Sequence, residues 1–553
     1  MTTLEPAVAR DGDEPVSEPA DRRWWSRAEQ VLGRFSEWLN PILVKETRQA
    51  LKSRQFGITF ALVLACGWIW SMLGVALIGP GIFYGAQGVW LFAGYYVVLS
   101  FPLLVIVPFG AFRSRAGERE DGTYEMLSVT TLKPRQIVSG KLGSAVLQMV
   151  VYFSGIAPCL AFTYMLEGID MPTILFVLFY TFLGSLGLSL AGLLIATVTA
   201  EKHWQVVLSV FLIFGLGLAF WGSCALVFEM VGWNSLPFQD EEFWIGNAAF
   251  STGYWSYFAL LAAAASAQLT FASDNRSTVL RIVMVGQQVL FAGWMGWAWI
   301  KYGEMEFLLV FLMISGLHWY AMGVFMNSES GELSQRVRRQ LPQSFLGRAF
   351  LTWFAPGPAT GFMFAFANLI SVALMTLIGV LIWLMFNPMP TPSWSGAMTL
   401  ERLLRFGGLG LGYVTVYLGL GRLLLSGLRR FIQVPMLLGV LVQVLLLLAA
   451  CFIPLTIHLM IPDLRRSYSL LEITNPIWTL GYSTFEAIIP QELFVIWCAV
   501  PLAAVVVFLA NVPAVVTAVR HVRIAKPRRV AEEDLLIEAQ RSPPTPEPVN
   551  PLD

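Results

Sequence analysis

The chain has 553 residues, of which 56% are hydrophobic and only 13% are charged, and its mean hydropathy is +0.65. Soluble domains carry about a quarter charged residues, so this balance excludes an ordinary soluble protein and indicates a polytopic membrane protein. Lys plus Arg and Asp plus Glu are both 36, and the resulting zero net charge gives no basis for nucleic-acid binding.

Five cysteines are present, and each lies inside an apolar run: Cys66, Cys159, Cys224, Cys451 and Cys498. None belongs to a CxxC pair or lies in a polar loop, where a disulfide or a metal site would be expected. We therefore expect them to be small apolar packing residues, and we expect no metal site in the chain.

Residues 23–56 form an amphipathic region that is predicted to be an interfacial connecting helix. Asn40 and Pro41 are typical of a helix start. Three cations then follow at helical spacing: Lys45, Arg48 and Lys52. We expect this helix to lie at the bilayer surface with its cations toward anionic lipid, a pattern that an ordinary juxtamembrane basic segment also shows.

Twelve apolar runs are long enough to cross a hydrocarbon core, which takes about 20 helical residues. They cover residues 57–79, 89–112, 142–166, 173–199, 205–231, 248–271, 282–300, 307–326, 362–386, 404–425, 432–459 and 493–519. The expected fold is therefore all-α, a polytopic integral membrane protein with about 12 transmembrane helices.

The distribution of cations orients these helices. With the N-terminus in the cytoplasm, the outer segments hold five of the 36 Lys and Arg residues: Lys301, Arg402, Arg405, Arg465 and Arg466. Cytoplasmic loops carry the excess of Lys and Arg in membrane proteins. We therefore expect a multi-pass protein of the inner (plasma) membrane with both termini cytoplasmic.

The two halves of the chain share a layout of two spans, a long cytoplasmic loop, two spans, a very short turn, a span, an outer segment and a last span. We interpret this spacing as a parallel six-plus-six duplication, although the two halves show no obvious sequence repeat. The predicted segments are a disordered tail at 1–22, a six-span module at 57–271 with a loop at 113–141, a linker at 272–281, a second six-span module at 282–519 with a loop at 327–361, and a largely disordered cytoplasmic tail at 520–553.

A dense polar segment, EREDGTYEMLSVTTLKPRQIVSGK, runs from Glu118 to Lys141 between two apolar runs. Its first residues concentrate negative charge, Gly122 permits a sharp turn, residues 123–130 are short and amphipathic, and Pro134 starts the next helix. Two interpretations fit this pattern. The segment is either a solvated loop that its charges keep out of the lipid, or a docking surface for another protein.

The order E-x-E-x-G-T-x-E-x-L, then T-L-x-P, then I-V-x-G-K resembles the coupling loop of permease subunits of the type-2 ABC exporter family. It is carried by Glu118, Glu120, Gly122, Thr123, Glu125, Leu127, Thr131, Leu132, Pro134, Ile137, Val138, Gly140 and Lys141. Residues 40–56, NPILVKETRQALKSRQF, resemble the connecting helix of the same family. The resemblance covers about residues 24–271 and implies that a separate ABC ATPase, which holds ATP and Mg²⁺, drives the spans through this loop.

The resemblance also implies roles for single residues. Glu118, Glu120 and Glu125 would face the ATPase, and Tyr124, Met126 and Leu127 would anchor the loop in it. The coupling-loop residues implied in this way are Glu118, Glu120, Gly122, Thr123, Tyr124, Glu125, Leu127, Pro134 and Lys141.

The chain departs from the family in its second half, because the usual subunit stops after six spans and dimerises. The loop at 327–361 lacks the acidic G-T-x-E pattern and is basic, with Arg336, Arg338, Arg339 and Arg348. It fits either a diverged second ATPase contact or a patch on anionic lipid. The pathway is then formed either by the two halves of one chain or by two copies of the chain.

The sequence contains no energy source of its own. No G-x-x-x-x-G-K-[ST] occurs, because Leu142 follows Gly140 and Lys141. Ion-coupled carriers need ionisable groups near the membrane midplane, whereas His318 and His458 are off-centre in spans that are nearly bare of such groups. We therefore expect no enzymatic activity and no cofactor in this chain.

Two alternatives stay open beside the ABC permease. One is an ion-coupled secondary transporter. The other is a membrane-embedded transferase acting on a lipid-linked substrate, whose best candidate carboxylates are Asp240, Glu241 and Glu242. Three adjacent carboxylates are more typical of a solvated surface, because they cannot all face one site.

Small residues and prolines mark expected contacts and kinks. Gly408 and Gly412 in the tenth span let helix backbones approach closely. Pro102, Pro108 and Pro158 are expected to kink their spans.

Overall fold

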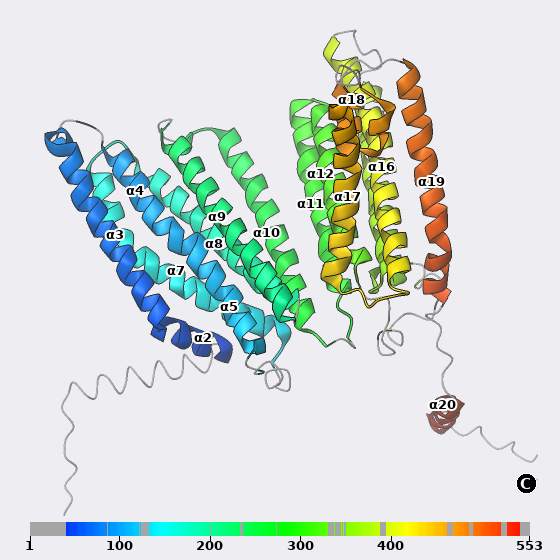
Figure 1. Ribbon diagram of the computed structural model, residues 1–553, viewed down its shortest axis with the longest axis horizontal. Helices are drawn as coiled ribbons and strands as arrows, with labels where there is room; N and C mark the ends of the chain where they lie inside the picture. The colour runs from blue at the N-terminus through cyan, green and yellow to red at the C-terminus, as the bar shows by residue number, and fades with distance from the viewer. Residues whose placement is uncertain are drawn as a thin grey trace, which may run out of the picture. The chain divides into compact units, whose positions relative to one another are not determined.

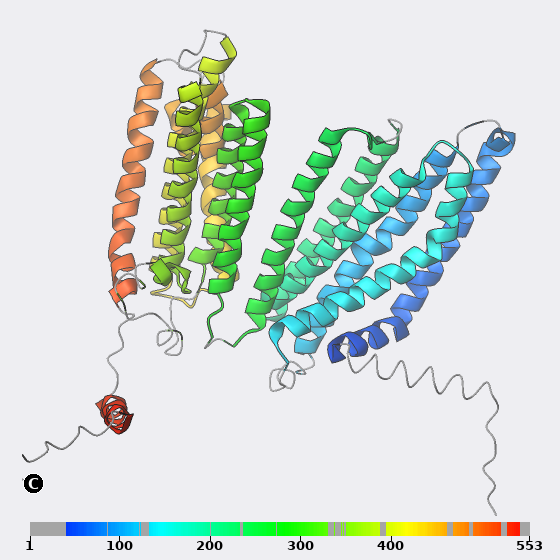
Figure 2. The same ribbon diagram turned by 180° about the vertical axis from the view of Figure 1, so that it is seen from behind.

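The computed structural model is described for residues 40–541 except 84, 86, 121, 123–131, 199–200, 233–235, 272–273, 330–336, 338–343, 345–346, 348–349, 387–393, 462–467, 486–489 and 521–527. All regular elements in these ranges are helical, and eleven helices are long and apolar enough to cross a membrane (Figures 1 and 2). The expected all-α polytopic membrane fold is confirmed. The predicted tail at 1–22 lies outside the described residues.

The chain divides into two compact units, Met1–Phe243 and Trp244–Asp553. The division precedes the predicted linker at 272–281, so residues 244–271 belong with the second unit rather than with the first. Eleven of the predicted spans match the membrane-length helices to within a few residues. The twelfth, 248–271, lies in α10 (Glu241–Leu269), a 29-residue helix that is not among the eleven because polar side chains interrupt its apolar run.

Unit 1 is a bundle of long helices with one short helix at its end. Its helices are α2 (Pro41–Lys52), α3 (Arg54–Ile78), α4 (Gly88–Phe101), α5 (Val107–Glu120), α7 (Pro134–Met165), α8 (Met171–Val198) and α9 (Lys202–Gly232), followed by the first residues of α10. The Asn40 side chain caps α2 by accepting a hydrogen bond from the Ile42 N–H at 3.1 Å, as the sequence predicts. Figures 1 and 2 show α2 lying across the ends of the longer helices.

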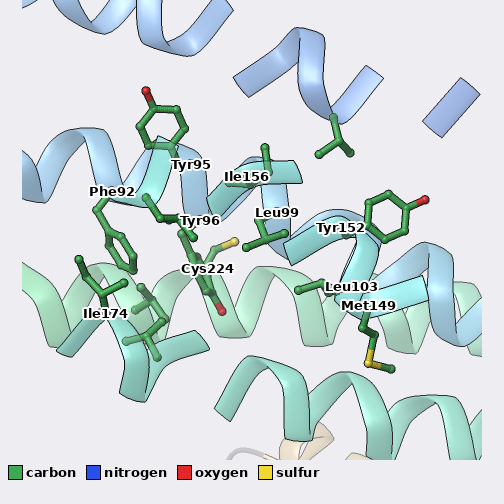
Figure 3. Close-up of a cluster of buried hydrophobic side chains, with 14 of the residues drawn as sticks. Phe92, Tyr95, Tyr96, Leu99, Leu103, Met149, Tyr152, Ile156, Ile174 and Cys224 are labelled. Atoms are coloured by element: carbon green, nitrogen blue, oxygen red, sulfur yellow. The ribbon is translucent and has the colours of Figure 1, made fainter. Parts of the chain in front are cut away.

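The core of unit 1 is built around α4 (Figure 3). Phe92, Tyr96 and Leu99 are at most 2% exposed and pack against Tyr152 of α7 and Cys224 of α9. Cys224 is thus a packing residue, as the sequence predicts. A helix with such a buried stripe is held by close packing rather than by a hydrophobic drive, because lipid is itself apolar.

The second span of unit 1 is interrupted where Pro102 was expected to kink it. Residues Pro102–Ile106 form a π-helical turn that joins α4 to α5. The Ser185 hydroxyl of α8 donates a hydrogen bond to the Leu103 carbonyl inside this turn. A π-helical turn breaks the regular hydrogen-bond pattern of an α-helix, and the hydrogen bond from Ser185 gives one of its carbonyls a partner inside the protein.

Unit 2 contains the remaining membrane-length helices. They are α11 (Thr278–Tyr302), α12 (Glu306–Asn327), α15 (Pro358–Phe386), α16 (Trp394–Leu428), α17 (Met436–Met460) and α19 (Pro490–Arg520), joined by the short η3 (Thr352–Phe354), η5 (Leu470–Thr474) and α18 (Pro476–Phe485) and followed by α20 (Arg528–Arg541). Trp319 of α12 is fully buried at its centre. Gly408 and Gly412 of α16 lie against Trp497 and Val500 of α19, which confirms the predicted small-residue seam.

Within each unit, helices that follow one another in the chain pack against each other. In unit 1, α3 packs on α4, α4 on α7, α5 on α8, α7 on α8 and α8 on α9. In unit 2, α11 packs on α12, α12 on α15 and α16, α15 on α16 and α16 on α17. In unit 2, α16 also packs on α19. The six-plus-six duplication stays a prediction.

Candidate functional site

The two ends of the predicted coupling loop are joined by a buried ion pair. Glu118 lies near the end of α5 and Lys141 lies in the second turn of α7, and the Lys141 Nζ is 2.9 Å from the Glu118 Oε1. The other carboxylate oxygen of Glu118 accepts a hydrogen bond from Arg115 at 2.9 Å. Glu118 is 9% exposed and Lys141 is 4% exposed, so this interaction is shielded from water.

Helix α2 enters the same cluster through Glu46. The Lys141 Nζ lies 3.1 Å from the Glu46 Oε1, and the Ser114 hydroxyl donates to the Glu46 Oε2 at 2.7 Å. Lys141 also donates to the Ser114 Oγ at 2.7 Å. The base cluster, defined as Glu46, Ser114, Arg115, Glu118 and Lys141, therefore contains two carboxylates and two cations. Buried charges are tolerated when they are paired and hydrogen-bonded in this way.

Close backbone packing holds α2 against α7 beside the base cluster. The Asn40 Nδ2 donates to the Gln136 carbonyl at 2.5 Å. At Gly140, an added Cβ would lie 2.9 Å from the Cβ of Ile42. Glycine is therefore needed at position 140 for α2 to reach this distance, which explains a glycine in the I-V-x-G-K part of the motif.

A Gly140→Ala substitution is expected to displace α2 from α7 and to lower the apparent stability of unit 1 by about 1–3 kcal/mol, because it overpacks a close contact. Thermal unfolding of the purified chain in detergent measures this loss. Gly57→Ala in α3 is the matched control, because a Cβ there meets nothing within 4 Å. An unchanged melting temperature in Gly140→Ala would show that the contact with Ile42 is dispensable.

A cavity of about 530 Å³ opens beside the base cluster. Glu46, Ser114, Glu118 and Lys141 form its polar wall, and Tyr152 of α7 lies on its apolar side. The cluster is thus buried against protein on one side and reached by solvent on the other. A movement of α2 or of the loop ends would change the hydration of these charges directly.

Most of the predicted coupling residues occupy helix ends or lie outside the described residues. Pro134 is the first residue of α7, as expected, and Gly122 adopts a left-handed φ of +68° in an exposed turn. Glu120 ends α5, and the structure does not describe its side chain. The predicted contacts at Thr123, Tyr124, Glu125, Met126 and Leu127 lie outside the described residues.

The expectation that Glu118 faces a partner is corrected by its geometry. Both of its carboxylate oxygens bind cations inside unit 1, and Lys141 is likewise turned inward. The physical reason is that α5 continues through Glu118, which places this side chain on the helix face toward α7. By contrast, the predicted stripe of Lys45, Arg48 and Lys52 is exposed along α2.

Three members of the base cluster were missed in the sequence. Glu46 is the one acidic residue of α2, which otherwise carries cations. Only its position along the helix relative to Lys45 and Arg48 indicates that it lies on a different face. Ser114 and Arg115 lie in the polar second half of α5, where a cation three residues before Glu118 is typical of a helix pair. No sequence pattern indicated that Lys141 would join α2 to α5.

Unit 2 carries a buried ion pair at the corresponding end of its second span. Arg281 of α11 is 1% exposed, and its guanidinium lies 3.0 Å from Glu329, two residues after α12. It also donates to the Trp353 carbonyl at 2.5 Å and to the Ala355 carbonyl at 2.7 Å. The two described ends of the loop at 327–361 are thus fastened to α11.

The predicted basic patch of this loop cannot be compared with the structure. Arg336, Arg338, Arg339 and Arg348 lie outside the described residues. The acidic group at Asp240, Glu241 and Glu242 is exposed at the start of α10, which agrees with a solvated surface. Among the residues that the structure describes, no group of three His, Cys, Asp or Glu side chains is placed to hold a metal ion.

The comparisons with known proteins supply no further identification. No family model, no characterised protein and no solved structure matches the chain.

Proposed function

We propose that the chain is the membrane-spanning permease of an ABC exporter, driven by a separate ATPase subunit. The observation that carries this proposal is the base cluster. It joins both ends of the segment at 121–133 to the interfacial helix α2, so a force applied to that segment reaches α5, α7 and α2 together. A loop that merely stayed in solvent would not need three helices tied at its ends by buried charges.

Three further features support the same proposal. The sequence has no phosphate-binding loop, so ATP hydrolysis belongs to a partner. The π-helical turn at Pro102–Ile106 interrupts the span that leads into this loop, which gives the movement a place to alter the helix. The two halves share a similar spacing of apolar runs in the sequence, which suits two halves of one translocation pathway. The membrane is proposed to be the plasma membrane, with both termini cytoplasmic.

A second candidate is an ion-coupled carrier, which one observation favours. The Nδ1 of His458 in α17 lies 3.4 Å from the Oε1 of Glu472 in η5, and both side chains are buried. Ionisable groups at such places in a membrane protein often belong to ion pathways. The sequence showed His458 but not its partner, which lies outside the predicted spans. This candidate predicts transport by the chain without an ATPase.

A charge reversal at Glu125 combined with Tyr124→Ala is expected to weaken ATPase association about tenfold or more, as for the loss of one interface anchor. The measurement is co-purification of the full chain with the ATPase subunit of its native complex, quantified by mass spectrometry. Glu201→Lys in the short turn before α9 is the matched control, because it changes charge on the same predicted face. Glu118 is unsuitable for this test, since its reversal would disrupt the base cluster.

The proposal fails if the native complex contains no ATPase. It also fails if the Glu125 and Tyr124 variant keeps its ATPase while ATP-driven transport persists. Transport that follows a proton or sodium gradient in the purified chain alone would instead select the ion-coupled carrier.

A further inference from the structure

Unit 2 contains a segment that re-enters the bundle to the depth of the middle of the spans. The Tyr413 hydroxyl donates to the Ile473 carbonyl at 2.6 Å, and the Tyr417 hydroxyl donates to the Thr474 carbonyl. Both tyrosines lie near the centre of the span Leu400–Leu428. The end of η5 is therefore well inside the bundle, although the chain enters from the end of α17 and leaves into α19.

A second helix gives the same depth independently. The Asn475 Nδ2 donates to the Cys451 carbonyl at 3.3 Å. Cys451 lies nine residues before Met460, the end of α17, which is about 14 Å along the helix at a rise of about 1.5 Å per residue. Non-helical backbone at this depth is found where it is buried in protein or lines a cavity.

A cavity of about 350 Å³ lies directly against this re-entrant segment. Pro476, Ile477 and Leu480 of α18 form one side, and the other walls come from α12, α15, α16 and α17. The glycines of α12 and α16 leave the space open: a Cβ at Gly316 would meet nothing within 4 Å, and a Cβ at Gly410 would meet only the ring of Phe406. The volume is within the range of small-molecule sites.

The chemistry of the walls selects an apolar occupant. The lining side chains are aliphatic or aromatic, and the hydroxyls of Tyr413 and Tyr417 are already bonded to η5. Tyr320 is the lining tyrosine whose hydroxyl forms no hydrogen bond with the described part of the chain. A charged ligand would lose its hydration here without a partner, so the site suits a hydrocarbon chain with at most one hydrogen-bonding group near Tyr320.

The rim of the cavity shows where such a chain comes from. Three lining residues are strongly exposed: Met313 at 42%, Leu317 at 70% and Ile477 at 73%. On membrane-length helices, exposed apolar surface of this kind is covered by lipid tails. The cavity is therefore continuous with the surface that the bilayer covers. We propose that it binds one hydrocarbon chain of a membrane lipid, which enters sideways between α12 and α18.

This site rests on unit 2 alone and does not depend on an ATPase partner. The test uses the full chain in nanodiscs of phosphatidylcholine that contain a trace of a phosphatidylcholine with a photoactivatable group on one acyl chain. After irradiation, mass spectrometry locates the labelled residues. Labelling is expected to concentrate on the cavity lining, with Leu411 of α16 and Ala373 of α15 among the labelled residues.

Two substitutions fill the cavity from different helices: Gly316→Leu from α12 and Ala373→Leu from α15. Each is expected to reduce labelling of the cavity residues about tenfold, which corresponds to a loss of about 1.4 kcal/mol in affinity. Gly293→Leu in α11 is the control, because this glycine is exposed and a Cβ there meets nothing within 4 Å. Its labelling is expected to match that of the unsubstituted chain.

The unsubstituted chain decides the question even if a variant fails to fold. Label spread evenly over lipid-facing helices, without preference for the cavity, would overturn the proposal. Preserved cavity labelling in folded Gly316→Leu and Ala373→Leu would show that the lipid binds elsewhere.

Discussion

Lys141→Met is expected to release α2 from α5 and α7 and to abolish ATP-driven transport. The substitution keeps the length and most of the volume of the side chain but removes the charge that faces both Glu46 and Glu118. Glu118 keeps Arg115 at 2.9 Å, whereas Glu46 keeps the neutral Ser114 hydroxyl at 2.7 Å and, as its nearest described cation, Lys45 at 4.0 Å, whose side chain is 56% exposed. Breaking a buried pair by removing one partner costs about 3–5 kcal/mol, because the remaining charge stays buried without compensation.

Two measurements check this result. Thermal unfolding in detergent gives the loss of stability, and hydrogen exchange of the α2 amides shows whether that helix is released. Lys133→Met, at an exposed position just before α7, is the control and is expected to stay within about 0.5 kcal/mol of the unsubstituted chain. A melting temperature for Lys141→Met that equals the control would show that the base cluster does not hold the three helices.

The double variant Lys141→Met, Glu46→Gln separates charge from packing. It restores the balance of the base cluster, and the amide of the new Gln can still accept the hydrogen bond from Ser114. The double variant is therefore expected to be more stable than Lys141→Met alone, by about 0.5–3 kcal/mol, the usual coupling between residues in one network. Transport is expected to stay low, since α2 is then no longer tied to Lys141.

Arg281→Met is expected to be the most damaging single substitution in unit 2. The guanidinium holds Glu329 and the carbonyls of Trp353 and Ala355 at once, and it is 1% exposed. Glu329 keeps the Ser277 hydroxyl and the Gly357 N–H. The Ala355 carbonyl keeps the Thr360 hydroxyl. The substitution still removes the buried cation beside Glu329 and the donor to the Trp353 carbonyl, and breaking a buried pair in this way costs about 3–5 kcal/mol. Lys is not an adequate replacement, because an ammonium lacks the fork of donors that reaches three acceptors.

Hydrogen exchange of η3 and of the first turn of α15 reports this change most directly, together with thermal unfolding. Arg430→Met is the control, because Arg430 is exposed at the end of the turn after α16. Unfolding at the same temperature in both variants, with no faster exchange at η3, would contradict the role assigned to Arg281. Faster exchange confined to η3 and α15 would locate the effect at the loop.

The fold was largely predictable from the sequence because apolar length and helix starts are local signals. Eleven of the twelve predicted membrane spans, the cap at Asn40 and the first residue of α7 at Pro134 are confirmed. The irregularity at Pro102 was also expected, but the π-helical form of the turn was not. It depends on Ser185 of α8, a contact across 82 residues that no local pattern shows.

The site was predicted less completely, because burial of a charge depends on tertiary contacts. Glu118 and Lys141 were recognised as part of the motif, but the motif gave no direction for their side chains. Glu46 is a single acidic residue in a basic helix, and only the placement of α2 against α7 makes it a partner of Lys141. In the same way, the pairing of Glu472 with His458 could not be predicted, because it depends on η5 packing against α17.

Lys45 and Glu46, which are adjacent in α2, lie in two different environments. Lys45 is 56% exposed on the face that a layer of anionic headgroups would cover, while Glu46 is turned into the buried cluster. Both side chains belong to the same turn of α2. Any tilt that the lipid surface imposes on α2 therefore moves Glu46 and directly changes its contact with Lys141. In the proposed permease, the composition of the surrounding leaflet would therefore bias the resting conformation through the orientation of this 12-residue helix.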